Sequence, residues 1–255
     1  MNTGSVAQRL ADTPGVARTI LGAARAARGM PGADPRAMSH SWLFTGPPGS
    51  GRSLAAIDFA AALMCTDPEE PGCGRCEACR AVLETKQHTD LVLVDPQEVI
   101  IPVDTVREVI GRAASLPTVA PWRVVIFNNA DRLNNNGANA LLKTVEEPPA
   151  RTVIIMCAPS DAPEDFSQTL RSRCRHLYIP SPSVESITAQ LVSEGASDHD
   201  AHLAALTSLR HVGRARRLVN DPAVQKRRAV AIKLAEEVFH GSQGFQAVTS
   251  LLKLV

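Results

Sequence analysis

The stretch that decides the fold covers residues 42–53 and reads Trp-Leu-Phe-Thr-Gly-Pro-Pro-Gly-Ser-Gly-Arg-Ser. Its first four residues form a short apolar run, which is typical of a buried strand. Gly46, Gly49 and Gly51 then follow at the spacing of a phosphate-binding loop, and the alanine-rich segment 53–65 has a helical pattern. Backbone N–H groups in such a loop, together with the start of the next helix, favour an anion. The stretch therefore predicts a strand, a phosphate-binding loop and a helix, in that order.

The same loop lacks the lysine that an ATPase needs. Arg52 stands in the lysine position, although Ser53 keeps the hydroxyl that follows it. The planar guanidinium cannot simply replace an ammonium between two phosphates. A second ATPase strand would end in Asp-Glu, whereas the apolar strand 124–127 is followed by Asn128 and Asn129. Neither amide can accept a proton from water or offer Mg²⁺ an anionic oxygen, so we expect no hydrolysis here, and the sequence leaves ATP binding open.

Strands and helices alternate after the loop. Apolar runs over 91–94, 123–127 and 152–157 are separated by segments with helical patterns over 103–115 and 137–147. Such alternation is typical of βαβ units around a parallel sheet. The sequence therefore predicts an α/β domain with a central parallel sheet.

The pattern changes near residue 180, after which we find only helical segments. We expect the α/β domain to cover residues 1–179 and a small helical domain to cover residues 180–240 of the 255-residue chain. The last segment, 241–255, is amphipathic and stops on apolar residues. We expect it to be the start of a further domain that is truncated here.

A cluster of cysteines follows the helix of the loop. Its four members lie within fifteen residues, with seven, two and two residues between successive thiols: Cys65, Cys73, Cys76 and Cys79. Four thiolates complete a tetrahedral Zn²⁺ site with no open position, which is typical of structural zinc. A redox-active Cys-x-x-Cys pair and a finger that reads DNA are the alternatives. The sequence favours a zinc module over residues 65–79.

Composition excludes some classes of protein. Lys and Arg number 27 against 26 Asp and Glu, which gives a net charge of +1, and 44% of the residues are hydrophobic. The chain therefore has no overall basic field for tight binding of nucleic acid by itself. It contains no apolar stretch of about 18 residues and no signal-peptide pattern at its start. We expect a cytoplasmic protein without a membrane contact.

Two further blocks complete a pattern that includes the loop and the cysteine cluster. Residues 139–149 read Asn-Ala-Leu-Leu-Lys-Thr-Val-Glu-Glu-Pro-Pro, and residues 169–174 read Thr-Leu-Arg-Ser-Arg-Cys. These four blocks occur in the order and approximate spacing of bacterial clamp-loader subunits of the AAA+ class. The chain resembles this family, and most closely its delta-prime type, over residues 5–240. The resemblance implies a RecA-like AAA+ domain with a zinc-binding insertion, followed by a helical lid. It also implies that residues 241–255 begin a collar domain.

The resemblance carries a functional expectation as well. Delta-prime subunits of DNA polymerase III commonly have a degenerate nucleotide site but keep Ser-Arg-Cys, as this chain does. Arg173 would then be an arginine finger that reaches the ATP site of a neighbouring gamma/tau subunit, where a permanent positive charge stabilises the transferring phosphoryl group. Gamma/tau and delta subunits, the sliding clamp and primed DNA would be partners in replication. The alternative is that Arg173 caps a helix or pairs with a local carboxylate.

Other interpretations of the chain remain open. Gly213-Arg214-Ala215-Arg216 resembles the start of the sensor 2 helix of the family, which would direct Arg216 toward the nucleotide pocket, but a solvated basic face explains it equally well. As a whole the chain would be a component of the DNA polymerase III holoenzyme without ATPase or polymerase active sites of its own. The rival functions are an active gamma/tau-like ATPase and a zinc-dependent DNA-binding module that works alone.

Overall fold

The computed structural model describes residues 4–96 and 98–239, and the chain divides into two compact units between Ser181 and Pro182. The first unit contains a sheet of five strands. Their bounds are β1 (Ser41–Thr45), β2 (Leu91–Val94), β3 (Arg123–Phe127), β4 (Thr152–Ala158) and β5 (Arg175–Tyr178). The expected start of a further domain, at 241–255, lies outside the described residues.

The sheet is parallel throughout, and its strand order is β2-β3-β4-β1-β5. The predicted α/β class with a central parallel sheet is therefore confirmed. In this order β1 lies between β4 and β5, so the loop after β1 leaves from inside the sheet. Parallel strands end at the same edge, which brings the residues that follow β1, β3 and β4 to one side of the domain.

Strand β5 is absent from the sequence prediction. It is an edge strand with exposed polar positions, so it lacks the apolar run that marks the other four. Its stability comes from the tertiary structure: it pairs with β1, and the Arg175 guanidinium lies 5.1 Å from the centre of the Trp42 ring. The Nε2 atom of His176 lies 2.5 Å from the Thr45 hydroxyl.

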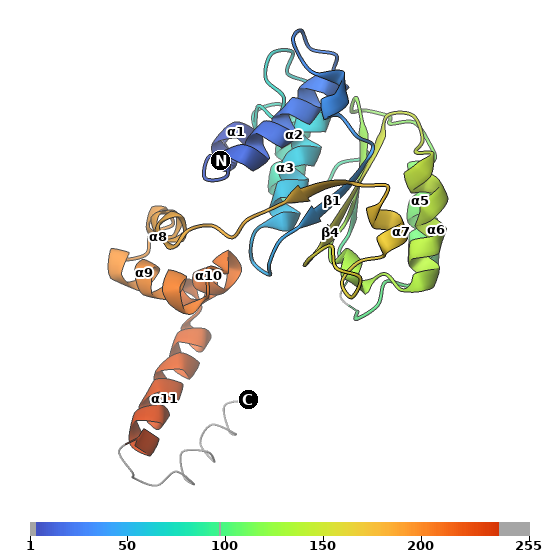
Figure 1. The fold of residues 1–255 in the computed structure, drawn as a ribbon. Helices are drawn as coiled ribbons and strands as arrows, with labels where there is room; N and C mark the ends of the chain where they lie inside the picture. The colour runs from blue at the N-terminus through green and yellow to red at the C-terminus, as the bar shows by residue number, and fades with distance from the viewer. Residues whose placement is uncertain (1–3, 97, 240–255) are drawn as a thin grey trace. The chain divides into compact units, whose positions relative to one another are not determined.

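Helices cover both faces of the sheet (Figure 1). On one face lie α1 (Val6–Arg9), α2 (Pro14–Ala27) and α3 (Arg52–Met64), and on the other lie α5 (Val103–Ala113) and α6 (Asn135–Glu146). The shorter elements of this unit are η1 (Pro35–Ala37), α4 (Glu77–Arg80), η2 (Ala81–Thr85), η3 (Ala130–Arg132) and α7 (Gln168–Arg171).

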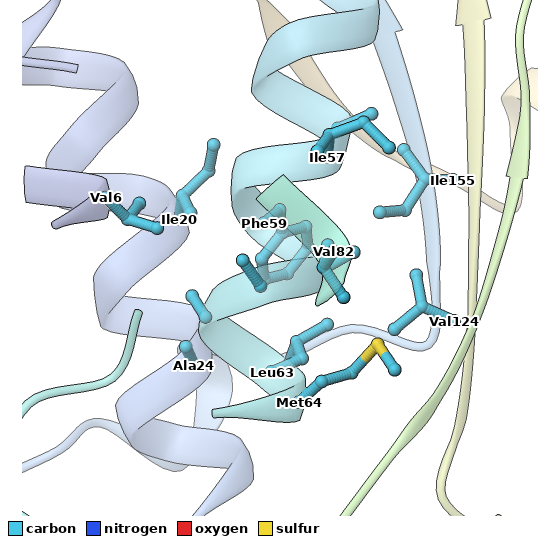
Figure 2. Close-up of a cluster of buried hydrophobic side chains, with 14 of the residues drawn as sticks. Val6, Ile20, Ala24, Ile57, Phe59, Leu63, Met64, Val82, Val124 and Ile155 are labelled. Carbon is cyan, nitrogen blue, oxygen red and sulfur yellow. The ribbon is translucent and has the colours of Figure 1, made fainter. Parts of the chain in front are cut away.

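Helix α3 is the central helix of the first core. Most of its length is buried, because α2 packs on one side of it and the sheet on the other. Figure 2 shows Ile20 on the side of the N-terminal helices, Phe59 within α3, and Val124 and Ile155 on the sheet. The Phe59 ring lies 5.1 Å from that of Trp42 in an edge-to-face arrangement. This packing fixes the start of α3, and therefore the loop that precedes it, against β1.

The second unit contains four helices within the described residues. Their bounds are α8 (Val184–Ser193), α9 (Asp198–Thr207), α10 (Val212–Asn220) and α11 (Pro222–Phe239). Ser183 and Ser197 cap α8 and α9 through their side chains, and Ile187 and Leu191 pack against small alanines of α9. None of the helices in residues 4–96 and 98–239 combines the length and apolarity needed to cross a membrane.

A buried carboxylate ties the starts of β2 and β3 together. Asp90 is fully buried and accepts hydrogen bonds from the backbone N–H groups of Thr118, Val119 and Ala120 at 2.8–2.9 Å, and from Arg123 Nη2 at 3.0 Å. Burial acts to raise the pKa of Asp90, but these donors hold it well below its ordinary value. The ionised carboxylate is therefore part of the folded structure.

We predict that Asp90→Asn lowers the free energy of unfolding by about 3 kcal/mol at neutral pH, because it leaves the buried Arg123 charge without its partner. A depressed pKa stabilises the fold above the unfolded value, so the difference from wild type should shrink as the pH falls below about 4. Urea denaturation at several pH values measures both effects. Asp104→Asn, at an exposed ion pair on α5, is the control and should change stability by less than about 0.5 kcal/mol. An equal loss in both variants would contradict the assignment.

Candidate functional site

The predicted phosphate-binding loop connects β1 to α3. Gly46 has a φ of 154°, and a Cβ atom there would lie 2.2 Å from the carbonyl oxygen of Ile179, so only glycine fits. The N–H of Ser50 donates to Pro47 at 3.0 Å and closes a turn. Gly51, in the left-handed region at φ 93°, is the N-cap of α3. The loop therefore has the glycine-dependent backbone that its sequence predicts.

The Arg52 side chain folds back on this loop. Its Nη1 atom donates to the carbonyl oxygen of Gly46, the first glycine of the loop. Burial lowers the pKa of Arg52, and nearby Cys157, Asp131 and Asp165 act in the opposite direction. This guanidinium is thus bonded to the loop's own backbone, and the carboxylates of Asp131 and Asp165 partly balance its charge.

The residues after β3 supply amides where an ATPase has carboxylates. Asn128 is 8% exposed, its N–H donates to the Val94 carbonyl at 2.8 Å, and its Oδ1 atom has no hydrogen-bond partner among the described residues. Asn129 adopts a left-handed backbone at φ 51°. Asp131, the nearest carboxylate along the chain, lies exposed on η3. The strand end thus holds no anionic ligand at the two positions that follow it.

Arg173 lies just after α7, between two anchored residues. Leu170 is fully buried and Cys174 packs against the same core, where burial raises the pKa of its thiol to about 12. Arg173 projects outward: its Nε lies 2.5 Å from Glu146 Oε1, and its Nη1 donates to the Thr169 carbonyl at 2.8 Å. Within this chain, the Arg173 side chain pairs with Glu146 and caps α7 through the Thr169 carbonyl. Its role toward a neighbouring ATP site stays a prediction.

Arg216 lies on α10 of the second unit. It forms a two-point ion pair with Glu194, with Nε to Oε2 at 2.8 Å and Nη2 to Oε1 at 2.6 Å. The hydrogen bond with Glu194 raises the pKa of Arg216 and lowers that of the carboxyl group. The expected approach of Arg216 to the nucleotide loop stays a prediction, since the pair lies within one unit.

The four clustered cysteines converge. All of their sulfur atoms lie within 4.8 Å of one another, although the residues come from the end of α3, a tight turn and α4: Cys65, Cys73, Cys76 and Cys79. Gly72 and Gly74 make the turn possible with φ values of 77° and 72°. At Gly74 a Cβ would lie 2.1 Å from the carbonyl oxygen of Gly4, so the N-terminal segment packs directly on the turn.

Backbone donors surround the sulfur atoms. The N–H groups of Asp67, Cys76 and Cys79 donate to the sulfurs of Cys65, Cys73 and Cys76, each at 3.4 Å. The hydrogen bond between Cys65 and Cys79 lowers the pKa of the Cys65 thiol to about 4 and raises the pKa of the Cys79 thiol. Because four sulfur atoms converge, the group could hold a metal ion as thiolates, and this set of ligands fits structural zinc. Nearby His88 accepts a hydrogen bond from the N–H of Asp90 at 3.0 Å and is not one of the four ligands.

Two contacts of these sites could not be found from the sequence. Ile179, after β5, closes the space beside Gly46, and β5 itself carries no apolar signal. Glu146 lies in the Glu-Glu-Pro-Pro block, but nothing in the block says that its partner is Arg173, 27 residues away.

The fold and the loop define the class of protein. A parallel sheet with a glycine-rich loop after an inner strand is a RecA-like, AAA+-type arrangement, to which this chain adds the four-cysteine group. A DNA polymerase III gamma subunit-related protein of Thermotoga maritima aligns with a TM-score of 0.50 at 20% identity, covering 83% of this chain and 66% of that one. RuvB of the same organism, in a mutant form, aligns with a TM-score of 0.51 at 16% identity, covering 95% and 69%.

Sequence comparison gives the family. The family described as "DNA polymerase III, delta subunit" matches residues 33–183, which is more than half of the chain, and the chain belongs to this family. The delta' subunit of Pseudomonas aeruginosa DNA polymerase III is 35% identical over 62% of this chain and 49% of its own length. That of Bacillus subtilis is 29% identical over 81% and 61%. The gamma/tau subunit of Mycobacterium tuberculosis is 33% identical over 66% and 30%. The chain thus spans about half the length of the delta' relatives.

Proposed function

We propose that this chain is a delta-prime-type subunit of the DNA polymerase III clamp loader that does not hydrolyse ATP itself. It supplies Arg173 in trans to the ATP site of a neighbouring gamma/tau subunit and helps load the sliding clamp onto primed DNA. Residues 1–179 would be the AAA+ domain, 180–240 the lid and 241–255 the start of a collar. The family and its relatives support the role in a clamp loader. The nucleotide loop and Arg173 support the proposal that this chain assists hydrolysis at a neighbouring site and does not hydrolyse ATP itself.

The observation that carries the proposal is the state of the nucleotide loop. Arg52 occupies the lysine position and its Nη1 donates to the Gly46 carbonyl, so a planar guanidinium tied to the loop stands where an ATPase has a point-charge ammonium. Asn128 and Asn129 replace the carboxylates that would order Mg²⁺ and activate water. A chain that keeps the loop but lacks its lysine and the carboxylates after β3 is suited to a structural role in an assembly.

Arg173 has the properties that a finger requires. Its side chain is 36% exposed, so a neighbouring subunit can reach it. Arginine side chains carry a permanent positive charge and can contact a phosphoryl oxygen through more than one N–H group. The ion pair with the half-exposed Glu146 engages Nε, so a phosphate can approach Nη2 while the pair is kept.

We also propose that the four cysteines hold one structural Zn²⁺. They are Cys65, Cys73, Cys76 and Cys79, and they offer a closed set of four sulfur ligands. The bound metal would cross-link the end of α3 to the turn and α4. It would not take part in catalysis, because four sulfur ligands leave no open coordination position. The turn residue Gly72 accepts a hydrogen bond from Val6 N–H at 2.8 Å, so the metal would also stabilise the docking of α1.

We predict that Arg173→Ala slows ATP hydrolysis in a loader reconstituted with its partner subunits. The site that receives the finger should slow by about 10³-fold, while the other sites continue. DNA- and clamp-stimulated turnover measures the loss. Arg171→Ala, which removes a neighbouring exposed arginine paired with Asp161, is the matched control and should leave turnover unchanged. Unchanged turnover with Arg173→Ala would remove the proposed role.

We predict that the purified chain carries about one Zn²⁺, from the arithmetic of four ligands per ion. Cys73→Ser should lose the metal, and a chelator should lower the unfolding free energy of the wild type by at least about 3 kcal/mol without affecting this variant. Metal analysis and denaturation with and without chelator measure these effects. Cys157→Ser, a buried cysteine outside the group, should keep the metal. A wild type that contains no metal would refute the zinc site.

A further inference from the structure

The Arg173 guanidinium is held at two of its three nitrogen atoms. Glu146 Oε1 accepts from Nε at 2.5 Å, and the Thr169 carbonyl accepts from Nη1 at 2.8 Å, with the Ser172 hydroxyl at 3.2 Å from the same nitrogen. Nη2 makes no hydrogen bond with the residues that the structure describes. The two contacts therefore fix the plane of the group and leave its outer corner free for an anion.

The two acceptors come from separately anchored elements. Glu146 is the last residue of α6, directly after the buried Val145, and two prolines follow at 148 and 149. Thr169 lies on α7, which Leu170 anchors in the same core. Because each acceptor is fixed by packing that Arg173 does not share, the contacts determine where the arginine lies.

The position of Glu146 is unfavourable for its own helix. A carboxylate at the C-terminal end of a helix faces the negative end of the helix dipole. Arg173 offsets that effect, yet both side chains are exposed, and exposed ion pairs contribute little to stability. Stability alone gives little reason for a carboxylate here, whereas orientation of the arginine gives a specific one.

We infer that Glu146 is a positioning residue for Arg173: it holds Nε so that Nη2 is presented to the phosphoryl group of a neighbouring subunit's ATP. The inference rests on the proposed function of Arg173. An arginine side chain without these contacts samples many rotamers, and an anion that binds it must first restrict them. Glu146 removes much of that cost before the neighbouring subunit arrives, and it stays on the Nε side when Nη2 meets the phosphate.

The test is a double-mutant cycle in the reconstituted loader, with kcat and KM for ATP measured separately. At the site that receives Arg173, Glu146→Ala should lower kcat by about fivefold and change KM by less than about twofold, since orientation acts mainly on the transition state. Glu146→Gln keeps an acceptor at Oε1 and should recover at least half of the loss. In the Arg173→Ala background, Glu146→Ala should cause no further loss. Glu147→Ala, the adjacent exposed glutamate, is the control and should behave as wild type.

The cycle separates failure of this inference from failure of the proposed function. If Arg173→Ala slows hydrolysis but Glu146→Ala behaves as wild type, the positioning role is wrong and the finger stands. If Glu146→Ala costs as much without Arg173 as with it, its effect is on the fold, and the positioning role is again wrong. If Arg173→Ala itself changes nothing, the finger and the positioning role both fail.

Discussion

Gly46 is held between the ends of two strands, and the candidate nucleotide site depends on that position. Its N–H donates to Pro159 after β4 at 3.2 Å, and the adjacent Thr45 carbonyl accepts from Ile179 after β5 at 2.7 Å. A side chain at Gly46 would overlap the Ile179 carbonyl, so only glycine lets the start of the loop lie this close to the end of β5. Because parallel strands end at one edge, the same constraint brings the residues after β1, β3 and β4 to one side of the sheet.

Within this fixed backbone, the two arginines of interest have opposite environments. Arg52 Nη1 donates to the Gly46 carbonyl within the loop, whereas Arg173 lies exposed after α7 and bonds to Glu146 and the Thr169 carbonyl. On the proposed function, the first arrangement accounts for a subunit that does not hydrolyse ATP, and the second for its contribution to a neighbour. The zinc module would then serve the fold, since its turn packs on the N-terminal segment.

Local patterns made most of the fold predictable. The apolar runs of β1 and β3, the glycine spacing of the loop and the cysteine spacing each report on structure formed within a few residues. Strand β5 was not predicted, because it is stabilised by tertiary contacts: it pairs with β1, and Arg175 packs on the Trp42 ring. The Arg173–Glu146 pair and the inward direction of Arg52 also depend on how the chain folds back, and no periodicity records them.

Mg²⁺-dependent ATP hydrolysis by the purified chain without partner subunits tests the central claim most directly. A single-turnover assay with excess protein reports on this chain's own site, because no neighbouring ATP site is present. We expect no hydrolysis above the uncatalysed background, since Asn128 and Asn129 can neither order Mg²⁺ as anions nor activate water. Magnesium-dependent turnover that disappears in Ser53→Ala would contradict the account and identify the chain as an active ATPase.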